Sequence, residues 1–250
     1  MMQISASPQP IIGVLRNSLV LFRKSWLKLL PIAVLIVGLS TVLFMLLPRQ
    51  TATLSMTMPR MPIKTLIVIF VLVCVMFWLF LILFYKCYRI LIAADVKYSL
   101  VFIVAIFRLF PSIITLFLCM LLVLLGVICF VIPGVFLFLL LIYSFLAVLI
   151  DHKNIFSSLK YSIQLGWGNW WRTLAVFLIA FVSMIIIALI VIVGVNFVVM
   201  SLLHLKIAVA TTVMNITSMV LPLFIWIFFA NVFICQYYDL KVRRHIKTSI

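Results

Sequence analysis

Six long apolar runs constrain the fold of this 250-residue chain more than any other feature of its sequence. A membrane-spanning helix needs about 20 consecutive apolar residues, because it rises about 1.5 Å per residue across a hydrocarbon layer about 30 Å thick. The runs cover approximately residues 29–47, 65–85, 111–132, 134–150, 173–199 and 209–235. The sequence therefore predicts an all-α polytopic membrane protein with six transmembrane helices.

The charge composition also excludes a soluble fold. Hydrophobic residues make up 68% of the chain and charged residues only 9%, which leaves too little polar surface to cover a soluble domain. Nineteen Lys and Arg stand against three acidic residues, Asp95, Asp151 and Asp239. Because no soluble basic face is available, we expect no nucleic acid partner, and instead contact with the anionic headgroups of membrane lipids.

The distribution of basic residues predicts the orientation. With a cytoplasmic N-terminus, fifteen of the nineteen Lys and Arg fall in cytoplasmic segments, and Arg49, Arg60, Lys64 and Lys206 fall outside. This asymmetry matches the excess of positive charge found on the cytoplasmic side of membrane proteins. The first apolar run is too long for a signal peptide and has no clear cleavage site after it. We therefore expect an uncleaved multi-pass protein with both termini in the cytoplasm.

Pro133 and Gly134 separate the third and fourth runs. Proline suits the second position of a tight turn and glycine the third, so the pair predicts a type II turn at the outer face. The alternative is a kink in one long helix. Residues 111–150 are about twice as long as one crossing requires, which favours a hairpin.

An internal repeat links two segments that precede apolar runs. Residues 15–30 and 159–174 match without gaps at a shift of 144. The matched pairs are Leu15/Leu159, Arg16/Lys160, Ser18/Ser162, Leu19/Ile163, Leu21/Leu165, Trp26/Trp170, Lys28/Arg172 and Leu30/Leu174. A degenerate third copy, at a shift of 80, places Lys28 on Arg108 and Pro31 on Pro111.

The repeat predicts one integral membrane domain built from three pseudo-repeats. Each is an amphipathic surface helix followed by a transmembrane hairpin. Their approximate bounds are residues 9–85, 90–150 and 154–238, followed by a basic cytoplasmic tail at 239–250.

The expected surface helices have apolar stripes at helical spacing. In the third unit the stripe is Ile155, Leu159 and Ile163, with Asn154 placed to cap the N-terminus. In the first unit it is Ile12, Leu15, Leu19 and Phe22. Such helices lie in the membrane interface rather than crossing it.

A turn rich in glycine and tryptophan follows the third surface helix. Gly166 and Gly168 are expected to end the helix, because glycine permits a sharp change of direction. Trp167, Trp170 and Trp171 are expected at the level of the lipid headgroups, which amphipathic indole rings prefer.

Several of these motifs together resemble a known family. The chain has an IPG turn at residues 132–134, Asp151, the phrase IFSSLKYS at residues 155–162, an aromatic turn at residues 167–171, and the ending YYDLKVR at residues 237–243. This pattern is similar to the YciC-like family of uncharacterised bacterial inner-membrane proteins, which is related to the membrane domain of some glycerophosphoryl diester phosphodiesterases. The resemblance covers about a third of the chain and implies a fold and a location in the bacterial inner membrane. It carries over no enzymatic residue, since the phosphodiesterase chemistry belongs to a separate soluble domain.

The sequence offers little material for catalysis or metal binding. There is no Glu, and the adjacent Asp151 and His152 would diverge by about 100° on a helix, so they predict no catalytic dyad. Asp151 is expected near the N-cap of the third surface helix, and Asp239 in an ion pair with Arg243 four residues later. The five cysteines are expected to act as small hydrophobic residues rather than as disulfides or metal ligands. We expect no enzymatic activity, no cofactor and no metal site.

Two functions from different classes fit this sequence. The first is a non-enzymatic membrane-organising or lipid-interacting protein with a basic cytoplasmic collar. Its candidate headgroup contacts are Arg16, Lys28, Arg108, Lys160, Arg172, Trp26, Trp170 and Trp171. The alternative is a transporter or channel for a small or lipid-like solute. Its candidate polar groove consists of Asn215, Thr217, Ser218 and Asn231.

Overall fold

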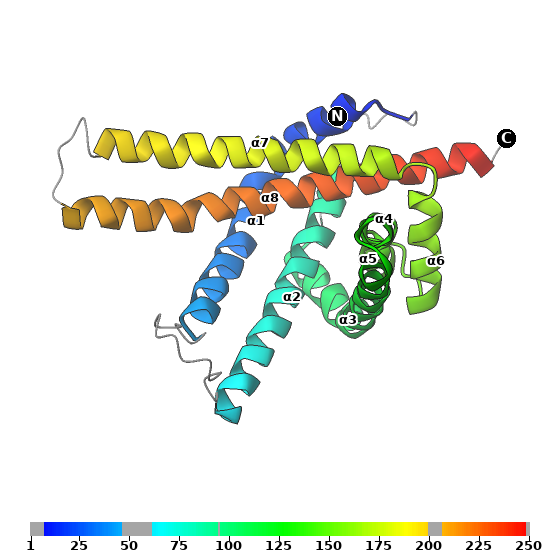
Figure 1. Ribbon diagram of the computed structural model, residues 1–250, viewed down its shortest axis with the longest axis horizontal. Helices are drawn as coiled ribbons and strands as arrows, with labels where there is room; N and C mark the ends of the chain where they lie inside the picture. The colour runs from blue at the N-terminus through cyan, green and yellow to red at the C-terminus, as the bar shows by residue number, and fades with distance from the viewer. Residues whose placement is uncertain (1–7, 47–61, 95, 200–206, 249–250) are drawn as a thin grey trace.

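The computed structural model describes residues 8–46, 62–94, 96–199 and 207–248 (Figure 1). Within these ranges the chain forms helices and no strand. The helices are α1 (Ile11–Leu46), α2 (Ile63–Leu91), α3 (Tyr98–Cys129), α4 (Val131–Leu141), α5 (Ser144–Ile150), α6 (Ile155–Gly166), α7 (Trp170–Phe197) and α8 (Ile207–Thr248).

Six helical segments in the described ranges are long and apolar enough to cross a membrane. They are Ile11–Leu46, Ile63–Leu91, Tyr98–Cys129, Val131–Ile150, Trp170–Phe197 and Thr211–Ile246. In hydrocarbon a helix satisfies its own backbone hydrogen bonds, which makes this architecture the stable one for such apolar segments. The predicted all-α polytopic membrane fold is confirmed.

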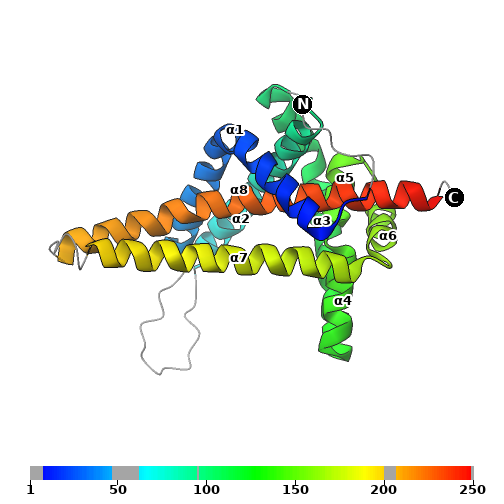
Figure 2. The same ribbon diagram turned by 90° about the horizontal axis from the view of Figure 1, so that it is seen from above.

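The helices form three hairpins that converge on one packed centre. α1 packs against α2, α3 against α4 and α5, and α7 against α8. Figures 1 and 2 show the α7–α8 hairpin extending to one side, while the α1–α2 and α3–α4 hairpins leave the centre in other directions. The N-terminal parts of α1, α3 and α7 and the C-terminal parts of α2 and α8, with all of α5, supply the buried centre.

Burial falls steeply away from this centre, which we call the central core. In α2 the buried residues begin only at Leu79, and in α7 they are Thr173, Val176 and Ala180. The central core therefore holds the bundle together, and the diverging parts of the hairpins expose apolar side chains such as Phe70 and Ile190.

The turn between α3 and α4 differs from the prediction. Pro133 and Gly134 do not form a type II turn, because both lie inside the first turns of α4. The chain reverses at Phe130, whose extended conformation (φ −165°, ψ 151°) separates the two helices. Gly134 serves a different purpose: a Cβ there would lie 2.9 Å from the backbone nitrogen of Val127. Its missing side chain lets α4 pack directly against the backbone of α3.

The fourth predicted span is interrupted. α4 ends at Leu141 and α5 begins at Ser144, so the span Val131–Ile150 has a break at Ile142 and Tyr143. The Ser144 hydroxyl donates a 2.6 Å hydrogen bond to the Leu141 carbonyl at the break. Tyr143 is fully buried there and stacks on Phe177 of α7. The break thus places an aromatic ring in the central core.

Only the third unit has a separate surface helix. α6 is distinct from α7, whereas the corresponding segments of the first two units are continuous with the spans as parts of α1 and α3. Pro31 and Pro111, which the repeat places at equivalent positions, both lie inside these long helices. Neither proline ends its helix, so the predicted division between surface helix and span holds only for α6 and α7.

The face of α6 that packs on the protein combines small residues with two leucines. Ser158 and Ser162 are fully buried there, together with Leu159 and Leu165. Of the predicted stripe, only Leu159 belongs to this buried face. The Ser162 hydroxyl donates a 2.6 Å hydrogen bond to the Leu140 carbonyl. Small side chains permit this close approach of two helix backbones.

In the first unit the predicted stripe is divided between the surface and the protein. Ile12 and Leu19 are exposed, whereas Leu15 and Phe22 are partly buried against the central core. The buried residues of this part of α1 are Val14, Ser18, Leu21 and Ser25.

The turn after α6 agrees with the sequence. The helix ends at Gly166, and Gly168 has φ 79°, a conformation that glycine adopts without strain. Asn154 occupies the predicted N-cap position of α6, although its side chain makes no capping hydrogen bond.

The close contact at Gly134 gives a test of the fold. We expect Gly134→Ala to lower the free energy of unfolding by about 1–3 kcal/mol, because the added methyl group would meet the backbone of α3. Gly194→Ala in α7 is the matched control, since a Cβ there meets nothing within 4 Å. Thermal unfolding of both variants in detergent measures the difference. Equal stability of the two variants would contradict the proposed helix contact.

Candidate functional site

The predicted headgroup contacts differ in exposure. Arg16, Lys28 and Lys160 are exposed, as is Trp171. Arg108, Trp26 and Trp170 are partly buried. The exposed basic side chains reach the surface of the bundle, where a lipid headgroup could contact them.

The tryptophans pack against neighbouring aromatic rings. Trp170 and Trp171 are stacked with 4.0 Å between ring centroids, and Trp170 meets Phe136 of α4 edge-on at 5.3 Å. Trp26, the repeat partner of Trp170, instead lies 6.4 Å from Phe224 of α8. Each partly buried indole thus contributes to packing between helices.

Arg172 is used inside the protein, in an ion-pair cluster around Asp239. Its guanidinium lies 3.1 Å from the Asp239 carboxylate and also donates to the backbone carbonyl of Gln9. Arg243 pairs with the same carboxylate at 2.8 Å, which confirms the predicted i,i+4 ion pair. The Gln9 backbone N–H donates to Asp239 at 2.9 Å. We call these four residues the Asp239 cluster.

The Asp239 cluster connects three parts of the chain. It joins Gln9, two residues before α1, to the start of α7 and the last turns of α8. The carboxylate is nearly buried, and buried charge is tolerated only when it is paired. Because its guanidinium is engaged here, Arg172 has a structural role that the sequence interpretation did not foresee.

Asp151 anchors α8 rather than capping α6. Its carboxylate accepts a 2.6 Å hydrogen bond from the Tyr237 hydroxyl and pairs with Lys241 at 2.5 Å. The N-cap of α6 is Asn154. His152 follows with φ 54° and is exposed, whereas the Asp151 carboxylate is engaged by Tyr237 and Lys241.

A cavity of about 370 Å³ opens beside this ion pair. Tyr161 of α6 forms part of its wall, with Lys153 Nζ 4.3 Å and Arg244 Cζ 4.5 Å from its ring centroid. Burial raises the pKa of the Tyr161 hydroxyl above its ordinary value, and the nearby Asp151 carboxylate raises it further. We call this feature the basic cavity; its lining residues are Asp151, Lys153, Tyr161, Lys241, Arg244 and His245.

Sequence reasoning missed the basic cavity. Asp151 and residues 237–243 both belong to the motifs that carry the family resemblance, but nothing in the sequence shows that they meet. The available signal was the scarcity of acidic residues. With so few carboxylates among so many cations, each one indicates an ion pair worth locating.

The predicted polar groove is not assembled. Asn215 and Ser218 are exposed, and Thr217 and Ser218 donate to carbonyls of their own helix, those of Val213 and Asn215. Asn231 lies sixteen residues beyond Asn215, about 24 Å along the same helix.

Asn231 is fully buried and joins three helices. Its carbonyl oxygen lies 3.2 Å from the Ser25 hydroxyl of α1 and 3.3 Å from the Cys87 sulfur of α2. Its amide donates a 2.6 Å hydrogen bond to Ile227 of α8. This is hydrogen bonding between helices, a usual role for polar side chains inside membrane helix bundles.

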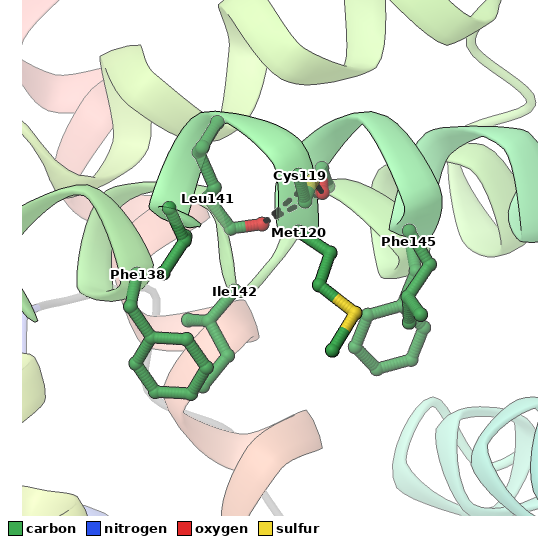
Figure 3. A pocket seen from close by; sticks show the side chains of 9 residues that line it. Cys119, Met120, Phe138, Leu141, Ile142 and Phe145 are labelled. Carbon is green, nitrogen blue, oxygen red and sulfur yellow. Dashed lines mark hydrogen bonds between the residues drawn. The ribbon is translucent and has the colours of Figure 1, made fainter. Parts of the chain in front are cut away.

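An apolar cavity of about 340 Å³ lies at the break between α4 and α5 (Figure 3). The Cys119 thiol and the Ser144 hydroxyl, which are polar groups in its lining, are joined by a hydrogen bond of 2.9 Å. In Figure 3 the side chains of Met120, Phe138 and Phe145 project to the same side of the helices. Such a lining suits hydrocarbon and offers nothing for polar chemistry.

Neither a metal site in the described residues nor a match to a known protein indicates a function. In the part of the chain that the structure describes, no three His, Cys, Asp or Glu residues are grouped to hold a metal ion. The cysteines are free; Cys87 and Cys235 are buried, as expected, while Cys129 is exposed. Comparison with known proteins gives no match to a family model, a curated protein or a solved structure. The YciC-like resemblance therefore stays a prediction from the motifs.

Removing the central charge of the Asp239 cluster tests its structural role. We expect Asp239→Asn to lower the free energy of unfolding by about 3 kcal/mol, because Arg172 and Arg243 would lose their shared carboxylate in a partly buried position. Lys160→Gln, at an exposed position, is the control and should change stability little. Unfolding in detergent measures both variants. A loss no larger for Asp239→Asn than for the control would show that the cluster does not stabilise the fold.

Proposed function

We propose that this integral membrane protein has no enzymatic activity and binds anionic lipid headgroups through its basic end, in the inner membrane of a bacterium. The observation that carries the proposal is the segregation of charge along the hairpins. In the described residues, the diverging parts (37–46, 62–78, 112–141, 174–199 and 211–226) contain a single charged residue, Lys64. The other charged residues that the structure describes lie at the end where the hairpins converge.

This basic end is suited to an anionic membrane surface. Each Lys or Arg near such a surface contributes about 1 kcal/mol of attraction. Arg16 and Lys28 of α1 and Lys160 of α6 are exposed there. Since the two described carboxylates are already paired with cations, the end keeps a net positive charge.

Neutralising exposed cations tests lipid binding. We expect the triple variant Arg16→Gln, Lys28→Gln, Lys160→Gln to retain about fivefold less anionic phospholipid for each charge removed, since 1 kcal/mol corresponds to about a fivefold change. Native mass spectrometry of the protein with mixed anionic and zwitterionic phospholipids measures retention. Lys64→Gln, at the opposite end of the bundle, should leave retention unchanged. Wild-type protein that retains both lipid classes equally would refute the proposal.

The orientation has its own test. Six spans would put both termini on the same side of the membrane, and the excess of basic residues supports a cytoplasmic location for that side. A fluorescent reporter that matures only in the cytoplasm should therefore fluoresce when fused after Ile250. The same reporter inserted after Met56, in the first predicted outer loop, should stay dark. The reverse pattern would place the basic end outside and contradict the proposal.

A further inference from the structure

The basic cavity is built from segments far apart in sequence. The connection between α5 and α6 supplies Asp151 and Lys153, α6 supplies Tyr161, and the last turns of α8 supply Lys241 and Arg244. A volume of about 370 Å³ is within the range of small-ligand sites. The cavity therefore depends on the folded bundle and is not a loose run of basic residues.

The cavity has an excess of positive charge. Lys153, Lys241 and Arg244 face a single carboxylate, that of Asp151. That carboxylate already accepts from Lys241 and from the Tyr237 hydroxyl. Three cations beside one such carboxylate favour an anionic ligand over a cationic one.

Tyr161 holds two of these cations in place. Lys153 and Arg244 both lie over its ring, and Arg244 also donates a 2.5 Å hydrogen bond to the Gln164 side chain. A cation held on an aromatic face loses less conformational freedom when it binds a ligand. The guanidinium fork and the ammonium group then present donors to one anion with several oxygen atoms.

We propose that the basic cavity binds a phosphate group, with Lys153 and Arg244 as the principal ligands and Tyr161 as the residue that positions them. This inference rests on the proposed function, because it identifies where in the basic end a phospholipid headgroup is held. The same chemistry would bind free phosphate, and the experiment separates the two sources.

The test uses the full-length protein in detergent with three probes. These are inorganic phosphate, a short-chain anionic phospholipid and short-chain phosphatidylcholine, with affinity measured by titration. We expect Lys153→Gln with Arg244→Gln to weaken binding of the anionic phospholipid at least about a hundredfold, because two charge-assisted contacts of about 1.5–3 kcal/mol each are lost. Arg16→Gln with Lys160→Gln is the matched control, which removes the same charge outside the cavity and should weaken binding less.

Each outcome distinguishes the two proposals. Equal weakening by both double variants overturns the cavity site and leaves a diffuse basic surface, so the proposed function survives. Binding of inorganic phosphate that is lost in the cavity variant, without preference for anionic lipid, supports the site with free phosphate as its ligand and refutes lipid binding. Wild-type protein that binds neither phosphate nor anionic lipid overturns both.

The role of Tyr161 has a separate measurement. Tyr161→Phe keeps the aromatic ring that Lys153 and Arg244 both contact and should retain most of the wild-type affinity. Tyr161→Leu removes the ring and should weaken phosphate binding several-fold. Arg244→Lys, which keeps the charge but not the guanidinium fork, should weaken it less than Arg244→Gln. Thermal unfolding first checks that each variant is folded. Equal affinity of the Tyr161→Phe and Tyr161→Leu variants would then refute the positioning role of Tyr161.

Discussion

The pairing of two buried or half-buried carboxylates is the interaction on which the converging end of the bundle depends. Asp239 and Lys241 are two residues apart on α8, so their side chains leave the helix about 200° apart, on nearly opposite faces. Asp239 reaches α7 through Arg172, while Lys241 reaches the end of α5 through Asp151. α8 is thereby held between α7, its partner in the third hairpin, and the end of α5 in the second hairpin. Because an unpaired charge in this partly apolar environment is costly, each pair fixes the position of α8 against its neighbour.

Packing follows from where small residues occur. Gly134 lets α4 meet the backbone of α3, and Ser162 lets α6 meet α4 closely enough to bond to a backbone carbonyl. Toward the hairpin turns, large apolar side chains such as Phe117 and Ile190 are exposed. In a bilayer these side chains would face lipid tails, which are as apolar as they are, so nothing drives them to pack together. The divergence of the hairpins therefore has a physical reason in the distribution of small and polar residues.

The sequence predicted the spans better than their connections and contacts. Long apolar runs determine helices because no other open structure satisfies the backbone in lipid, so the all-α membrane fold could be foreseen. The prediction of a type II turn at Pro133–Gly134 was wrong. The two residue types suit a tight turn locally, but the glycine is required because α4 packs against Val127 of α3. The sequence also could not show which faces of α1 and α6 pack on protein, since hydrophobic periodicity cannot distinguish exposed apolar residues, such as Ile12 and Leu19, from a stripe that faces protein. Arg172 and Asp151 found partners 67 and 90 residues away, a separation that no local pattern encodes.

The two matching repeat segments, residues 15–30 and 159–174, make different contacts in the structure. Ser18 bonds to Val14 within its own helix, whereas its counterpart Ser162 bonds to α4. The difference arises because α1 runs on into its span, while α6 stops at Gly166 and lies as a separate helix across the second hairpin. As a separate helix, α6 packs on α4 and α5 and also meets α8. This explains why the basic cavity forms in the third unit, where Tyr161 of α6 faces the end of α8, and why the repeat alone could not locate it.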